Sequence, residues 1–73
     1  MNLTEAKAGT LVVIERIAGD RSFLQRVTAI GLLEGTAAQV VRNDPGMPML
    51  LYCRETLLAL HRGSAARIEV RPV

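Results

Sequence analysis

The sequence predicts a mainly-β fold, a small barrel of about five strands with one short helix between the first and second strands. Short runs rich in valine, isoleucine and leucine recur along the 73 residues, and turn signals made of glycine, proline and aspartate separate them. Only segment 21–30 repeats its apolar residues at helical spacing. A chain of this length can bury only a small core, so we expect one domain over residues 1–73.

The N-terminal segment 3–9 predicts a single helical turn. Thr4 is a candidate N-cap, Glu5 suits the positive end of a helix, and Gly9 can end the turn in a left-handed conformation. Segment 10–18 is then expected to form the first strand, because β-branched residues dominate it.

Segment 21–30 predicts the helix. It begins after Asp20, a residue that favours the N-cap position. Phe23, Val27 and Ile30 repeat at positions i, i+4 and i+7, and this spacing indicates a helix with one apolar side. The glycine that follows is expected to end the helix, which would cover one end of the barrel.

Four further strands are expected after the helix, over residues 35–43, 49–53, 56–61 and 66–71. Residues 44–48 contain two prolines that fix φ and a glycine that permits positive φ, so they predict a turn. Arg54 and Glu55 are expected to form a tight hairpin turn, and residues 63–65 a bend. Pro72 should end the last strand because it has no N–H to donate.

The composition favours a folded protein in the cytoplasm. Hydrophobic residues make up 49 % of the chain and charged residues 22 %, which indicates a packed core rather than disorder. A single cysteine suits a reducing compartment. The longest apolar run is about five residues, where a membrane span needs ~20, and the N-terminus lacks the pattern of a secretory signal. We therefore expect no direct membrane insertion.

Catalysis and metal binding find little support among the side chains. The candidate nucleophiles are Ser22, Ser64 and Cys53, and no local signature surrounds any of them. His61 is the only imidazole, and with Cys53 the only soft metal ligand, whereas structural zinc normally takes four ligands. We therefore expect a non-enzyme without cofactor or metal site, in which Cys53 is buried or at the rim and His61 lies at a solvent-exposed edge.

Recognition of another protein is the function class that remains. Arg21, Arg26 and Val27 are expected near the surface of the helix, and arginine beside apolar side chains is a frequent interface composition. These three are the candidate partner-binding residues. The turn 44–48 and the strand edges offer a second surface, through main-chain pairing. Nucleic-acid binding is less favoured, because the net charge is only +2 and the chain has two aromatic residues.

Four segments, in this order, resemble the FeoA family of bacterial ferrous-iron uptake. Residues 3–9 are similar to the family's opening Leu-Ser/Thr…Gly. Residues 26–35 resemble its Arg-Leu-x-x-Leu-Gly-Leu/Met-x-Pro-Gly segment, and residues 44–48 its Pro-x-Gly-Asp-Pro turn. Residues 58–70 resemble its closing Leu-Ala-Leu-Arg…Glu-Ala-x-x-Ile-x-Val. The resemblance thus extends over nearly the whole chain.

The resemblance implies an SH3-like barrel that acts as a cytosolic accessory of the membrane transporter FeoB. Its role would be to bind and modulate the cytosolic part of that partner, with no nucleic acid involved and at most weak homo-oligomers. Glu34, Met47 and Glu55 stand where the family usually has proline, aspartate and glycine, so the turns are expected to differ there. The alternatives are a generic SH3-like interaction domain and a small nucleic-acid-binding barrel.

Overall fold

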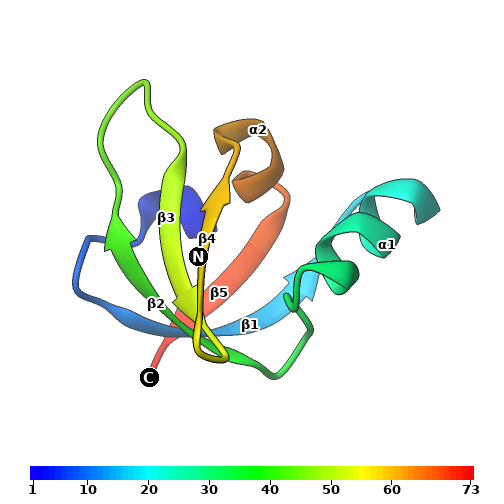
Figure 1. Ribbon diagram of the computed structural model, residues 1–73, viewed down its shortest axis with the longest axis horizontal. Helices are drawn as coiled ribbons and strands as arrows, with labels where there is room; N and C mark the ends of the chain where they lie inside the picture. The colour runs from blue at the N-terminus through cyan, green and yellow to red at the C-terminus, as the bar shows by residue number, and fades with distance from the viewer.

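The computed structural model describes residues 1–73 and contains one curled, five-stranded antiparallel sheet with a helix projecting from it (Figure 1). The elements in chain order are η1 (Leu3–Glu5), β1 (Leu11–Ile17), α1 (Arg21–Ala29), β2 (Ala37–Arg42), β3 (Met49–Cys53), β4 (Thr56–Leu60), α2 (Arg62–Ala65) and β5 (Ile68–Pro72). The mainly-β prediction, with a helix between the first two strands, is confirmed. A second, one-turn helix, α2, replaces the predicted bend at 63–65.

The strand order in the sheet is β4-β3-β2-β1-β5, so β4 and β5 are the edge strands. The ladder shifts register between Ile14 and Arg16 in the β1–β5 pair, and between Val40 and Arg42 in the β2–β3 pair. Such bulges bend a strand and increase its twist. They allow five short strands to curl around a common core.

The core consists of apolar residues only, and no polar or charged residue is buried. In β2, buried Ala38 and Val40 alternate with exposed neighbours, which is the period of two that places one face of a strand inside. Ile68 and Val70 of β5 share the inner face, as predicted. Residues outside the strands also contribute to the core, and one of them is the fully buried Leu32 in the segment between α1 and β2.

The cap of η1 differs from the prediction. Asn2, and not Thr4, is the N-cap: its Oδ1 accepts the Thr4 N–H at 2.9 Å, while Glu5 Oε1 accepts the Asn2 N–H at 2.9 Å. This reciprocal arrangement satisfies two main-chain donors. The Thr4 hydroxyl donates to Asn2 Oδ1 at 2.7 Å instead of capping the turn itself. Gly9 has a φ of +90°, in line with its predicted left-handed conformation.

Helix α1 contacts the barrel through a narrow strip. Asp20 Oδ1 accepts the Phe23 N–H at 2.8 Å, which confirms the predicted N-cap. Phe23 and Val27 are its only buried residues. Leu24 and Ile30 are 37 % and 43 % exposed, although both were expected to continue the apolar side of the helix. The barrel offers a contact only two side chains wide, so the rest of the apolar stripe faces solvent.

Candidate partner-binding surfaces

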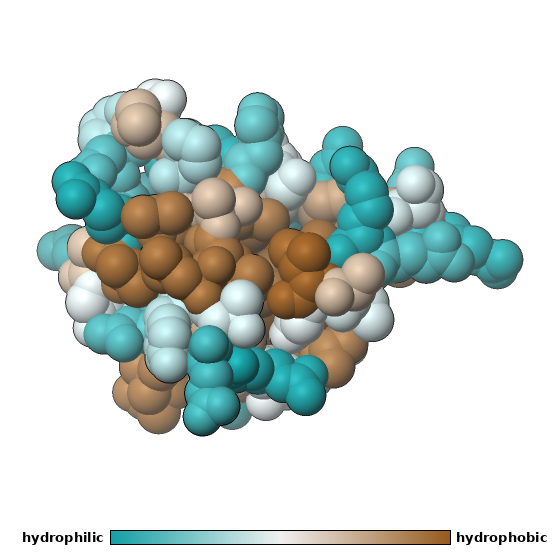
Figure 2. Space-filling view, viewed as in Figure 1, coloured by the Kyte–Doolittle hydropathy of each residue, from teal (hydrophilic) through white to brown (hydrophobic).

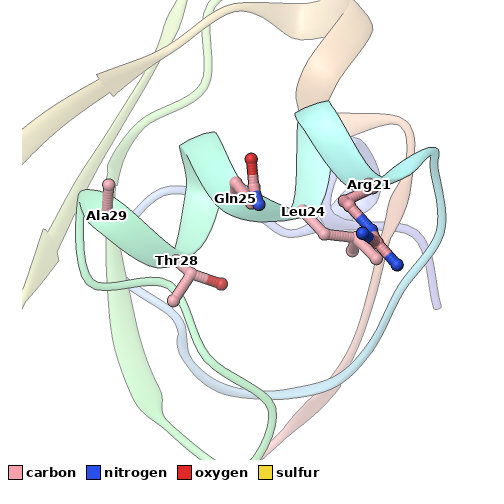
Figure 3. A pocket seen from close by; sticks show the side chains of 5 residues that line it. All are labelled: Arg21, Leu24, Gln25, Thr28 and Ala29. Carbon is pink, nitrogen blue, oxygen red and sulfur yellow. The ribbon is translucent and has the colours of Figure 1, made fainter.

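The outer side of α1 combines apolar and basic side chains over a shallow hollow of about 360 Å³. Five residues line this hollow, and we call them the α1 face: Arg21, Leu24, Gln25, Thr28 and Ala29. Figure 3 shows the side chains of Arg21 and Leu24 next to each other at the N-terminal end of the helix. Because α1 projects from the barrel (Figure 1), this face is open to a partner.

The three predicted partner-binding residues lie in different environments. Arg21 is exposed on the α1 face, and Arg26 is exposed outside it. Val27 is 3 % exposed and belongs to the core, so its expected surface position is wrong. Its spacing of four from Phe23 places it on the side that faces the barrel. The exposed apolar residue of this surface is Leu24 and not Val27. Its i, i+3 spacing from Arg21 could have predicted that the two side chains lie next to each other.

Two guanidinium groups cover the ring of Phe23. Arg67 lies 5.0 Å and Arg26 5.9 Å from the ring centroid, distances at which a cation is attracted by an aromatic face. Neither arginine forms an ion pair with a carboxylate. Arg67 lies between α2 and β5, so its contact with Phe23 helps to hold α1 against the barrel, whereas Arg26 belongs to α1 itself. Both guanidinium groups leave unneutralised positive charge at the base of the helix.

A second hollow, of about 320 Å³, lies between the turn 44–48 and the outer side of the β3–β4 hairpin. It is lined by Arg42, Asp44, Met47, Pro48, Leu50 and Ala59. Arg62 fixes this turn, because its guanidinium donates to the Asp44 and Met47 carbonyl oxygens at 3.2 and 3.1 Å. Figure 2 shows a continuous apolar band across the face on which β3 and β4 lie. This groove is therefore a second candidate surface for a protein partner.

Cys53 and His61 have structural roles. The Cys53 thiol is buried and directed at the Ala37 carbonyl oxygen at 3.5 Å. Burial raises the pKa of this thiol, and the positive charge of Arg54 acts weakly in the opposite direction. His61 is exposed, and its Nδ1 accepts the Gly63 N–H at 3.1 Å, which caps α2. The predicted buried cysteine and exposed histidine are confirmed, and no group of three potential metal ligands gathers in the structure.

We predict that Cys53 reacts slowly with Ellman's reagent in the folded protein. The thiolate is the reactive species, and both burial and the raised pKa disfavour it. Labelling should accelerate about a hundredfold in denaturant, because it requires opening of the sheet. The stability that this neutral thiol contributes is present below its unfolded-state pKa and is lost as pH rises through the folded-state value. Equal labelling rates with and without denaturant would contradict the buried placement.

Comparisons with known proteins find one family along the chain. The sequence profile described as the FeoA domain matches residues 1–72. A protein of Methanocaldococcus jannaschii named "Putative Fe(2+) transport protein A" is 31 % identical over 68 residues, which cover 93 % of this chain and 82 % of that protein. Neither helix of the structure has the length and apolar character that crossing a lipid bilayer requires.

Solved structures of similar proteins have the same fold. A crystal structure of an iron uptake regulatory protein, FeoA, has a TM-score of 0.95 and 26 % identity, over 100 % of this chain and 97 % of that one. Zinc-bound FeoA of Stenotrophomonas maltophilia has a TM-score of 0.82 and 26 % identity, over 97 % of this chain and 89 % of that one. The latter is described as a prokaryotic SH3 domain protein and a candidate ferrous iron transport activating factor. This description agrees with the SH3-like class that the resemblance implies.

Proposed function

Since the chain belongs to the FeoA family, we propose that it is a cytosolic accessory protein of ferrous iron uptake that binds and regulates the cytosolic part of a FeoB-type membrane transporter. The family is associated with ferrous iron transport. The match over residues 1–72 is the observation that carries the proposal. The relatives are named for transport and for an SH3 domain rather than for a reaction, and we propose no catalytic role.

The α1 face supports binding to a protein. It presents exposed Leu24 beside exposed Arg21, and the guanidinium groups of Arg26 and Arg67 add positive charge near the base of the helix. An acidic helix or loop of the transporter, with an apolar residue at its centre, would complement this surface. Since only two residues of α1 are buried, a partner can cover the rest of the helix without disturbing the core.

The positions of the two aromatic residues favour a protein partner over nucleic acid. Phe23 is buried beneath two arginines and presents no free ring face for a base. Tyr52, which is 46 % exposed on the outer side of β3, is the only exposed aromatic ring of the two. Binding of single-stranded nucleic acid relies on several exposed rings along a basic groove, and this arrangement does not supply them.

Charge reversal on α1 tests the proposal. We expect Arg21→Glu and Arg26→Glu each to weaken binding to the purified cytosolic domains of the FeoB-type transporter by roughly 5- to 50-fold. Isothermal titration calorimetry gives the dissociation constants. Lys7→Glu, an equal charge reversal in the segment after η1, serves as the control and should change the affinity less than about twofold.

Two outcomes would count against these statements. Absence of binding by the wild-type chain to every cytosolic part of the transporter would overturn the proposed function. Unchanged affinity in both arginine variants would move the contact away from α1, and the groove beside the turn 44–48 would then be the surface to vary.

A further inference from the structure

The two edges of the sheet differ in their protection. The free edge of β5 is covered by the N-terminus, because Met1 and Val70 exchange main-chain hydrogen bonds of 2.7 Å in both directions. The strand also carries the charged residues Glu69 and Arg71 and ends at Pro72. Cover, charge and proline are the means by which proteins prevent an edge strand from pairing with another chain.

The free edge of β4 has none of these features. β4 pairs with β3 alone, and its sequence, TLLAL, contains no charge and no proline. Leu57 is 60 % exposed, and the apolar band of Figure 2 extends over this part of the molecule. An apolar edge strand without protection is a template for a further strand.

The hairpin register determines which main-chain groups of β4 point outward. A two-residue turn joins β3 to β4, and both of its φ angles are positive, +52° and +64°. In such a hairpin the closing pair, Cys53 and Thr56, is hydrogen-bonded, and hydrogen-bonded pairs then alternate along the strands. Leu57 and Ala59 therefore direct their N–H and C=O groups away from β3. Neither forms a main-chain hydrogen bond outside the regular elements.

We propose that β4 is a self-association edge, along which two copies of this chain pair antiparallel about a two-fold axis at Leu58. Leu57 of one copy then lies opposite Ala59 of the second, and each of these residues uses its outward N–H and C=O. Leu58 meets Leu58 of the second copy. This side chain is only half-buried against the core, and the pairing covers its remaining apolar surface.

A second copy is the occupant because this edge is complementary to itself. The two outward-facing residues are symmetric about Leu58, so the same groups satisfy each other in both copies. At each end, Glu55 of one copy lies opposite His61 of the second, beside its Arg62. A pair of five-residue strands buries less than the roughly 1,200 Å² of a standard interface. The dimer is therefore weak, with a dissociation constant of about 10–1,000 µM, and α1 remains free to bind another protein.

Sedimentation equilibrium from about 20 µM to 2 mM measures the association. We expect a monomer–dimer equilibrium, with concentration-dependent amide shifts in ¹H–¹⁵N spectra that centre on Leu57 and Ala59. Leu57→Lys places a charge on the edge and should weaken the association more than tenfold. Val41→Lys introduces the same charge at an exposed position of the interior strand β2, and it should change the dissociation constant of the dimer by less than twofold. Ala59→Pro removes one outward donor without adding charge and should also weaken it more than tenfold.

Leu58→Cys gives a positive signature of the register. Opposed residues of a non-hydrogen-bonded antiparallel pair lie about 4.5 Å apart at Cα, within the range of a disulfide. Oxidation with copper–phenanthroline should therefore produce a covalent dimer, while buried Cys53 stays unreactive. Leu57→Cys is the control, because in this register each Leu57 lies two positions along the strand from Leu57 of the second copy. Its yield of covalent dimer should be at least tenfold lower than that of Leu58→Cys. A chain that is monomeric at all concentrations, or a dimer that survives both Leu57→Lys and Ala59→Pro, would overturn the proposal.

Discussion

Val27→Glu is expected to lower the free energy of unfolding by about 3–5 kcal/mol, because it places a charge without a partner in an apolar core. Val27 is 3 % exposed, and every residue buried with it is apolar. The helix can relieve the new carboxylate only by moving away from the barrel. That movement would expose Phe23, the other buried residue of α1, to water as well.

Urea unfolding followed by circular dichroism measures this loss. A domain of this size has a total stability of roughly 4–11 kcal/mol, so the variant should lose a large share of its stability and unfold at a much lower urea concentration than the wild type. Burial raises the pKa of the introduced carboxyl group, so the difference in unfolding free energy between Val27→Glu and the wild type should narrow as the pH falls from that raised value towards the unfolded-state pKa of glutamate, about 4.3. Val27→Ala should lower the free energy of unfolding by about 1–3 kcal/mol. Arg26→Glu, at an exposed neighbouring position, should change it by no more than about 1 kcal/mol. Equal losses in Val27→Glu and Arg26→Glu would contradict the buried position.

Local signals in the sequence were sufficient for the element boundaries of α1. Asp20 caps the helix and Gly31 ends it with a φ of +98°, because capping depends on neighbouring residues alone. The number of apolar side chains that α1 buries was harder to predict than its boundaries. Leu24 and Ile30 belong to the same apolar stripe as Phe23, yet they stay exposed, since the width of the contact is set by the barrel surface and not by the helix.

The short helix α2 shows the opposite case, in which tertiary structure overrides propensity. Gly63 and Ser64 are poor helix formers, and the sequence accordingly predicted a bend. The turn is helical because the His61 side chain accepts the Gly63 N–H and because Ala65 is fully buried on the core side. Burial of one side chain is a long-range property that no local pattern contains.

The candidate surfaces depend on the same kind of information. The sequence indicated that strand edges could pair, but which strand is free follows from the order β4-β3-β2-β1-β5. That order is set by pairings between residues far apart in the chain, such as Val13 with Arg71. The outward direction of the Leu57 and Ala59 amides follows in turn from the two-residue hairpin turn.

Leu51→Ala is expected to lower the free energy of unfolding by about 2–5 kcal/mol. Leu51 is fully buried in β3, and its register partners are Val40 in β2 and Leu58 in β4. Hydrogen-bonded ladders on both sides fix the backbone of β3, so the sheet cannot collapse into the space that the lost side-chain atoms leave. The cavity term therefore adds to the lost burial of the side chain.

Leu57→Ala is the matched control, because the same atoms are removed from a 60 % exposed position on the neighbouring strand. It should change the free energy of unfolding by no more than about 0.5 kcal/mol. Both variants are compared by urea unfolding at about 5 µM, where most of the chain is monomeric throughout the proposed range of dissociation constants. Similar losses in the two variants would mean that the inner and outer faces of β3 and β4 are wrongly assigned. The direction of the free amides along the β4 edge rests on that same register, so one pair of unfolding curves tests the core and the proposed interface together.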